Sequence, residues 1–143
     1  MTAYIAISFG QRHQLDHQLA TIVEVLRKFN IQAHVFVDRY HFDSTQEQEM
    51  MQQVMTDINN CDILLAETTH KGIGIGIEAG YAKAQNKPVV YLRQHTAEHS
   101  TTLSGISDYQ IIYESTDALI TQLSLVLSKI IDRQNDDFTQ KPS

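Results

Sequence analysis

The feature that most constrains the fold is a regular alternation of short apolar segments with longer segments of helical apolar spacing. Five short segments have the length and β-branched content of buried strands, at residues 3–8, 32–37, 62–66, 89–92 and 110–113. Strands that alternate with helices are typical of a parallel sheet covered on both faces. We therefore expect an α/β fold built on a doubly wound five-stranded parallel sheet, in the flavodoxin-like order 2-1-3-4-5.

Helical segments fill the intervals between these strands. The first helix and the last carry apolar residues every three or four positions, as expected when a helix buries one face. The residues on these two faces are Leu15, Leu19, Ile22, Val23 and Leu26, and Leu119, Leu123, Val126, Leu127 and Ile130. The Ser-Thr-Gln-Glu sequence at 44–47 fits a capping box for the second helix, and Ser115 or Thr116 can cap the last helix. Residues 93–107 are predicted to form a polar loop.

The 143 residues carry neither an internal repeat nor a linker, which predicts one domain. We expect this domain over residues 1–133 and a polar, frayed tail over residues 134–143. Eleven lysines and arginines against seventeen aspartates and glutamates give a net charge of −6, and the basic residues are scattered. A nucleic-acid polymer is therefore not an expected partner, because phosphate backbones are bound by clustered positive charge.

Membrane and secretory features are not found in the sequence. No apolar run approaches the roughly 18 residues that span a bilayer, so no membrane partner is expected. The N-terminal MTAYIAISFG lacks the basic region and cleavage site of a secretory signal, and we expect a cytoplasmic protein. Cys61 is the single cysteine, which rules out an intrachain disulfide and a cysteine-based metal site.

A glycine-rich segment after the third strand is the most informative part of the sequence. In a sheet of this order, ligands bind at the carboxyl ends of the first and third strands, and Gly72, Gly74 and Gly76 lie there. Alternating glycines allow close backbone approach and unusual dihedral angles, and they lead to Glu78 in the predicted first turn of the next helix. A helix N-terminus keeps a carboxylate ionised, which suits attack on a cationic carbon. The alternative is that Glu78 is only a favourable helix residue and the glycines only a turn.

Other patterns are weaker. The spacing of Gly74, Gly76 and Ala79 satisfies a loose dinucleotide fingerprint, which leaves a dehydrogenase-like cofactor binder as a remote alternative. His13 and His17 are more consistent with solvated helix residues than with a zinc site, and we expect no metal. Ser8 and Arg12 follow the first strand and could meet an anionic ligand. Residues 34–41 form either a substrate-facing loop or a polar connection.

Three segments together resemble the nucleoside 2-deoxyribosyltransferase family and its relatives, the deoxynucleoside 5'-monophosphate N-glycosidases. They are Tyr4-Ile-Ala-Ile-Ser8, Cys61-Asp62-Ile-Leu-Leu-Ala-Glu67 and Gly74-Ile-Gly76-Ile-Glu78-Ala-Gly80-Tyr-Ala82. The resemblance covers roughly residues 3 to 113. Its most specific element is the Gly-x-Gly-x-Glu-x-Gly-Tyr-Ala stretch.

This resemblance implies a retaining mechanism without a cofactor. Glu78 would attack the anomeric carbon, expel the base and form a glycosyl-enzyme ester, which water or a second base resolves. Tyr4 would hold Glu78 by a hydrogen bond, and Ser8 would contact the ligand. Ser104 resembles a serine that monophosphate-cleaving members contribute from the neighbouring subunit, which implies a homodimer or higher oligomer.

Two positions depart from the family pattern. Family enzymes carry an aspartate about 24 residues before the nucleophile, where this chain has Val54, and Asp57 one turn along could replace it only if the helix is rotated. Six residues before the nucleophile, Gly72 stands where the family has Asp or Ser. The sequence therefore predicts cleavage or transfer of the N-glycosidic bond of a (deoxy)nucleoside or its 5'-monophosphate, with Gly72, Gly74 and Gly76 contacting substrate. The alternative is a non-catalytic nucleotide-binding protein on the same scaffold.

Overall fold

A computed structural model describes residues 1–140 and contains one five-stranded sheet. All neighbouring strands pair in parallel, and their order is β2-β1-β3-β4-β5. The predicted fold class and strand order are confirmed. The strands are β1 (Thr2–Ala6), β2 (Gln32–Val35), β3 (Ile63–Glu67), β4 (Val89–Gln94) and β5 (Tyr109–Tyr113).

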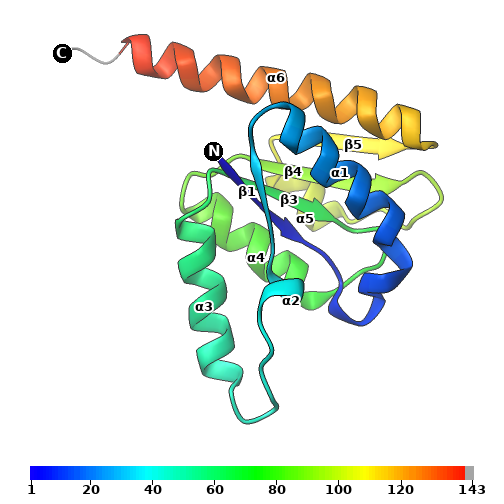
Figure 1. Ribbon diagram of the computed structural model, residues 1–143, viewed down its shortest axis with the longest axis vertical. Coiled ribbons are helices and arrows are strands. Elements are labelled where there is room, and N and C mark those ends of the chain that lie inside the picture. The colour runs from blue at the N-terminus through cyan, green and yellow to red at the C-terminus, as the bar shows by residue number, and fades with distance from the viewer. Residues whose placement is uncertain (141–143) are drawn as a thin grey trace.

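Helices cover both faces of the sheet (Figure 1). One layer contains α1 (Asp16–Lys28) and α6 (Thr116–Gln140), which pack against each other. The other contains α3 (Glu47–Asn59), α4 (Ile73–Ala84) and α5 (Thr101–Ile106), with α4 between its two neighbours. Two short helices lie at the carboxyl edge, η1 (Phe9–Leu15) after β1 and α2 (Phe36–Arg39) after β2.

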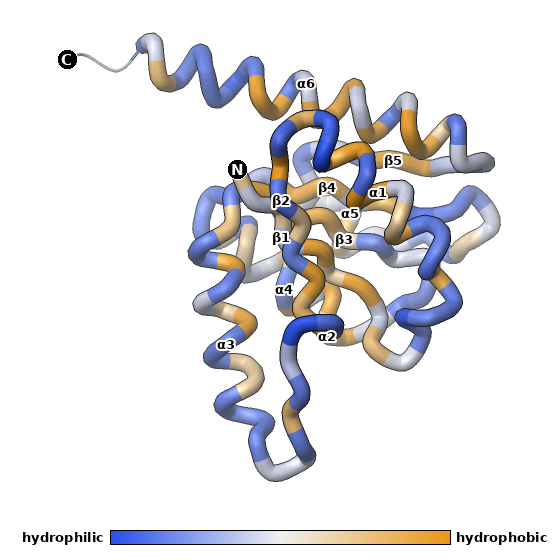
Figure 2. Tube along the Cα trace, viewed as in Figure 1, coloured by the Kyte–Doolittle hydropathy of each residue, from blue (hydrophilic) through white to orange (hydrophobic). Residues whose placement is uncertain are grey.

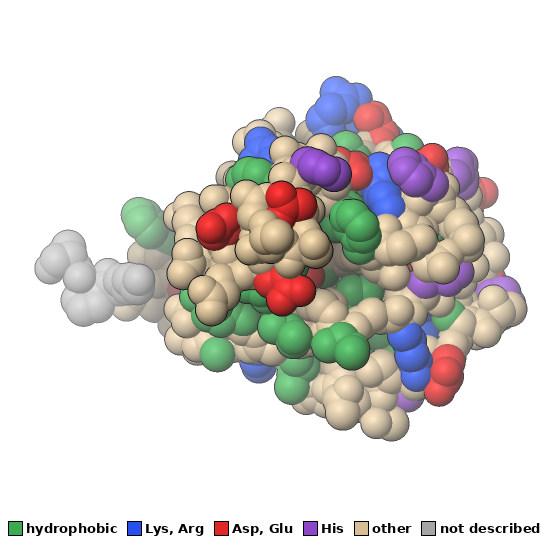
Figure 3. Space-filling model, turned by 90° about the horizontal axis from the view of Figure 1, so that it is seen from below, with side chains coloured by type: hydrophobic (Ala, Val, Ile, Leu, Met, Phe, Trp, Pro, Cys, Tyr) green, Lys and Arg blue, Asp and Glu red, His purple; other side chains and the backbone are tan. Residues whose placement is uncertain are grey.

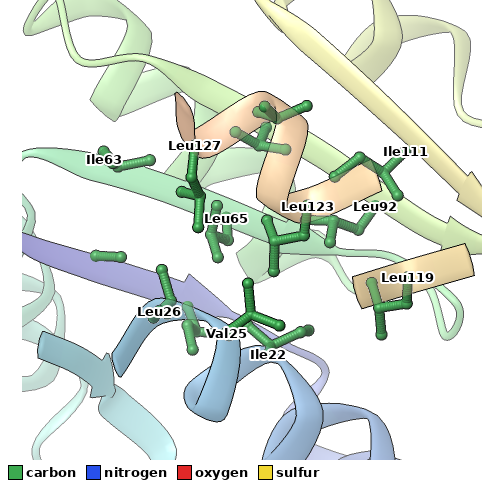
Figure 4. Close-up of a cluster of buried hydrophobic side chains, with 14 of the residues drawn as sticks. Ile22, Val25, Leu26, Ile63, Leu65, Leu92, Ile111, Leu119, Leu123 and Leu127 are labelled. Atoms are coloured by element: carbon green, nitrogen blue, oxygen red, sulfur yellow. The ribbon is translucent and has the colours of Figure 1, made fainter. Parts of the chain in front are cut away.

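The strands divide their side chains between two cores. On β1, Ala3 and Ile5 pack toward α1 and α6, while Tyr4 and Ala6 pack toward α3 and α4, because successive strand residues point to opposite faces. Figure 4 shows leucine and isoleucine side chains of the first core meeting between the sheet, α1 and α6. In Figure 2 the central strands are almost continuously apolar, whereas the helices alternate. The buried sheet is therefore a rigid base for its carboxyl edge.

The predicted capping box does not form. Helix α3 begins at Glu47, and the preceding Gln46 makes no side-chain cap. The carboxylate of Asp43 instead accepts a hydrogen bond from the Thr45 backbone N–H at 2.8 Å, and the Gln46 side chain accepts one from the Asp43 N–H. A local turn around Asp43 therefore precedes α3 in place of the predicted capping box.

The second half of the chain contains more helix than predicted. The predicted polar loop at 93–107 includes α5, whose first turn is capped by Ser100. Ser115 accepts a hydrogen bond from the Ala118 N–H at 3.1 Å and caps α6, as predicted. The prediction of a frayed tail is wrong over residues 134–140, since α6 continues to Gln140 and no glycine or proline interrupts it; residues 141–143 lie outside the described part of the chain. No helix among residues 1–140 is long and apolar enough to cross a membrane.

Candidate active site

A cleft of about 500 Å³ lies at the carboxyl ends of β1 and β2, beside the start of α4. Its walls are mostly apolar and aromatic. Figure 3 shows the molecule from below, and on this face hydrophobic side chains lie between acidic and histidine side chains. The Phe36 ring lies 4.9 Å from that of Tyr40 and stacks with Phe42 at 6.1 Å between centroids. Aromatic faces of this kind hold flat heterocycles by stacking. The remaining apolar lining residues include Ile7, Phe9, Met50, Met51, Val54 and Ile75.

Glu78 projects from α4 into this cleft, but not from the first helical turn. The helix begins at Ile73, and no acidic residue stands in its first turn. The predicted stabilisation of the carboxylate by the helix N-terminus is therefore wrong. Burial raises the pKa of Glu78 to about 7, and the nearby Tyr4 hydroxyl opposes only part of that rise.

Tyr4 lies on β1 beneath Glu78 and is completely buried. Its hydroxyl has no hydrogen-bond partner within 3.5 Å among the described residues. Burial, and then the proximity of Glu78, raise the pKa of Tyr4. The structure thus brings the two predicted catalytic residues close together, but the predicted hydrogen bond between them is not formed in it.

The glycines create space rather than unusual backbone geometry. No described glycine has a positive φ, so the expected unusual dihedral angles do not occur. Gly72 and Gly74 line the cleft, and a Cβ built on Gly74 would lie 3.5 Å from Glu78 Oε1. Gly76 lies outside this cleft, in a neighbouring hollow between α4 and α5 that Lys71 also lines.

Loop residues after β1 have different surroundings from one another. Ser8 lines the cleft, as predicted. Arg12 does not face it freely, because its guanidinium binds Asp38 at 2.9 Å and also pairs with Asp16. The Arg12–Asp38 pair joins η1 to α2 and so braces two walls of the cleft.

The histidines near the first helix show no metal-binding arrangement. His13 is exposed, and His17 Nε2 lies 3.0 Å from the Thr116 hydroxyl. Within residues 1–140, no three His, Cys, Asp or Glu side chains group in a way that could hold a metal ion.

Asp57 does not reach the cleft, whereas Val54 lines it. The Asp57 carboxylate is buried 2.9 Å from His34 Nε2 and accepts a hydrogen bond from Gln53 at 2.8 Å. Arg39 lies 2.7 Å from His34 Nδ1, and because arginine can only donate, this ring nitrogen is the acceptor. Asp57 therefore joins α3 to β2 and is not positioned as a substrate ligand.

Ser104 also lies away from the Glu78 cleft of its own chain. It stands on α5, where its hydroxyl accepts a hydrogen bond from the Gln110 side chain. The cleft also contains Phe36, Tyr40 and His41, from the segment 34–41 that the sequence left open as a substrate-facing loop or a polar connection, and Phe42 just after it. The available signal was the group of aromatic residues Phe36, Tyr40 and Phe42, which stand close together at the end of the second strand segment and just after it.

Comparisons with known proteins find relatives over most of the chain. A family model described as nucleoside 2-deoxyribosyltransferase matches residues 3–140. A Thermofilum pendens protein named 2'-deoxynucleoside 5'-phosphate N-hydrolase 1 is 23% identical over 128 residues, which cover 81% of this chain and 90% of the relative.

Two solved structures share the fold. The CMP N-glycosidase BcmB of Clostridium botulinum superposes with a TM-score of 0.66 at 18% identity, covering 88% of this chain and 99% of its own. A 2-deoxyribosyltransferase from Bacillus psychrosaccharolyticus gives a TM-score of 0.65 at 16% identity, covering 84% and 90%.

Proposed function

The chain belongs to the nucleoside 2-deoxyribosyltransferase family, whose members cleave or transfer N-glycosidic bonds, and from this premise we propose a covalent mechanism centred on Glu78. The substrate is a (deoxy)nucleoside or its 5'-monophosphate. The observation that carries the proposal is the Glu78 carboxyl group, held next to buried Tyr4 in a cleft with aromatic walls. No other carboxyl group lines this cleft in the described part of the chain.

The arrangement supports a sequence of two displacements. The base stacks against the rings of Phe36, Tyr40 and Phe42, which brings the anomeric carbon toward Glu78. The Glu78 carboxylate attacks that carbon, the carbon–nitrogen bond breaks, and an ester joins sugar to protein. Tyr4 orients the attacking oxygen. Water or a second base then displaces Glu78 and releases the sugar or a new nucleoside.

We also propose that the working unit is a homodimer in which Ser104 reaches the substrate phosphate in the neighbouring cleft. Two observations support this arrangement. Ser104 does not line the cleft of its own chain, and α4 exposes Ile73 and Ile77, which are 87% and 52% accessible one turn apart. Exposed apolar side chains at helical spacing are a common feature of subunit interfaces. Gly72, Gly74 and Ser8 contact the sugar or phosphate from within the chain, and Gly76 does so from the neighbouring hollow.

Release of free base tests the proposal directly. Ribonucleosides, deoxyribonucleosides and their 5'-monophosphates are incubated with the protein, with and without an acceptor base, and the products are separated by chromatography. We expect release from at least one substrate and its loss in Glu78→Ala. A requirement for acceptor base identifies transfer, and release without it identifies hydrolysis.

Val54 favours one alternative, a protein that binds nucleotides without cleaving them. This residue places a hydrocarbon in the cleft wall where an acid could assist departure of the base. Tight nucleotide binding with no base released from any substrate would establish that alternative and contradict the enzymatic proposal.

A further inference from the structure

We propose that His41 is the acid that protonates the departing base, an inference that rests on the proposed function. When the bond between the anomeric carbon and nitrogen breaks, its electron pair moves onto the base. A base that leaves as an anion is a poor leaving group, so a proton delivered during cleavage accelerates the step by roughly 10²- to 10⁴-fold. The cleft must therefore contain a donor besides Glu78, which forms the new bond to carbon.

The polar side chains in the cleft offer few donors. Apart from Glu78, the lining contains Ser8, Tyr40 and His41. A serine hydroxyl is too weak an acid, and burial together with Asp57 raises the pKa of Tyr40 above that of an ordinary tyrosine. Asp57 itself is buried outside the cleft. An imidazole is the one group of this set that exchanges protons near neutral pH.

The position of His41 fits this role. It follows α2, on the wall built by the segment between β2 and α3, whereas Glu78 projects from α4. Its side chain is exposed and makes no hydrogen bond or ion pair with residues 1–140. The aromatic residues Tyr40 and Phe42 flank it in the sequence and line the same cleft, so a base stacked on that wall lies within reach of the imidazole.

Three other titratable groups face the same region. They are Asp43 on the following turn, Tyr40 on the same wall and Glu78 on α4. The Thr45 hydroxyl, which donates a hydrogen bond to the Asp43 carboxylate, mainly lowers the pKa of Asp43, and the charge of His41 adds a smaller lowering.

The proton balance closes over one turnover. His41 gives its proton to the base as the carbon–nitrogen bond breaks and the Glu78 ester forms, and it is then neutral. Neutral His41 takes a proton from the attacking water as that water breaks the ester. This second step restores the imidazolium and the Glu78 carboxylate, so no further reagent is required.

The test compares two leaving groups in one cleft. A purine nucleotide that the protein cleaves is set beside its 7-methyl derivative, whose base carries a fixed positive charge and leaves neutral without a proton. We expect His41→Gln to lower the single-turnover rate of base release, a step that precedes breakdown of the ester, about 100-fold or more on the ordinary substrate, and to change that rate on the 7-methyl substrate by less than about 3-fold. His13→Gln, at an exposed histidine outside the cleft, serves as the matched control and should change neither.

Each other outcome overturns a defined claim. Equal losses on both substrates would mean that His41 acts in binding or folding, and no loss on either would mean that it has no role. Both results overturn the assignment of His41 as the acid. In either case, base release that depends on Glu78 still supports the proposed function. A wild-type protein that releases neither base above the Glu78→Ala background overturns the proposed function and the role of His41 together.

Discussion

At the scale of single residues, the burial of Glu78 links activity to pH. The carboxyl group must be ionised to attack carbon, and its pKa is raised to about 7. We therefore expect kcat/KM to fall about tenfold for each unit of pH below about 7. A pH–rate profile on the best substrate measures this limb, and a profile that stays flat down to pH 5 would contradict the role of Glu78 as nucleophile.

The same burial predicts a stability gain in Glu78→Gln. The folded protein keeps the Glu78 proton up to about pH 7, whereas the unfolded chain loses it near 4.5. The free energy of unfolding therefore decreases as pH rises between these values. We expect Glu78→Gln to be more stable than wild type by about 2 kcal/mol at pH 8 and no more stable at pH 4. Urea denaturation at the two pH values measures the difference.

Tyr4→Phe tests the partner of Glu78. The buried hydroxyl has no close hydrogen-bond partner in the described structure, so its removal should leave the fold intact and alter stability by less than about 1 kcal/mol. Because the hydroxyl lowers the pKa of Glu78, its loss should move the acid limb of the pH–rate profile to higher pH. An unchanged limb would show that the Tyr4 hydroxyl does not affect the pKa of Glu78.

The sequence predicted Tyr4, Ser8 and Glu78 as neighbours because the strand order places their segments at one edge. It could not predict the charge state of Glu78, since that depends on how much of the carboxyl group is buried. It also placed Glu78 one turn too early, and it offered Asp57 as a conditional replacement for the aspartate of the family pattern. His34 and Gln53 hold Asp57 elsewhere, and a partner as distant in sequence as His34 leaves no local signal.

At the scale of elements, two serines with similar local sequences should behave differently. Ser115 caps α6, whereas Ser44 makes no cap on α3. We expect Ser115→Ala to lower the free energy of unfolding by about 1 kcal/mol, and Ser44→Ala to leave it unchanged. Equal effects of the two substitutions, measured by chemical denaturation, would contradict this assignment.

The Asp57 carboxylate joins two elements behind the cleft. Asp57→Ala removes a buried carboxylate that lies 2.9 Å from the His34 ring and leaves the Gln53 amide without its acceptor, which should cost about 3 kcal/mol of stability. Glu24→Ala removes an exposed ion pair with Arg27 on α1 and should have no measurable effect. If Asp57→Ala abolishes base release while stability is unchanged, Asp57 acts on the substrate after all.

At the scale of the whole molecule, helix α4 has two roles that the sequence did not separate. Its buried side packs on the sheet and positions Glu78, while Ile73 and Ile77 remain exposed. The alternation of strands and helices predicted that a helix follows β3, because the apolar face of the sheet must be covered there. In the proposed dimer this outer face contacts a second chain, and no spacing within one sequence reveals such a contact.

Mixing two damaged chains tests the proposed dimer. Glu78→Ala and Ser104→Ala should each lower release of base from the 5'-monophosphate substrate. In a two-fold dimer where Ser104 acts on the neighbouring cleft, a mixed dimer contains one cleft with both groups intact, so equal mixing should restore about a quarter of the wild-type sites. Glu78→Ala mixed with Tyr4→Phe is the matched control, since both changes affect a chain's own cleft and no mixed dimer contains an intact one. Recovery only in the first mixture places Ser104 across the interface, and equal recovery in both, or in neither, contradicts that arrangement.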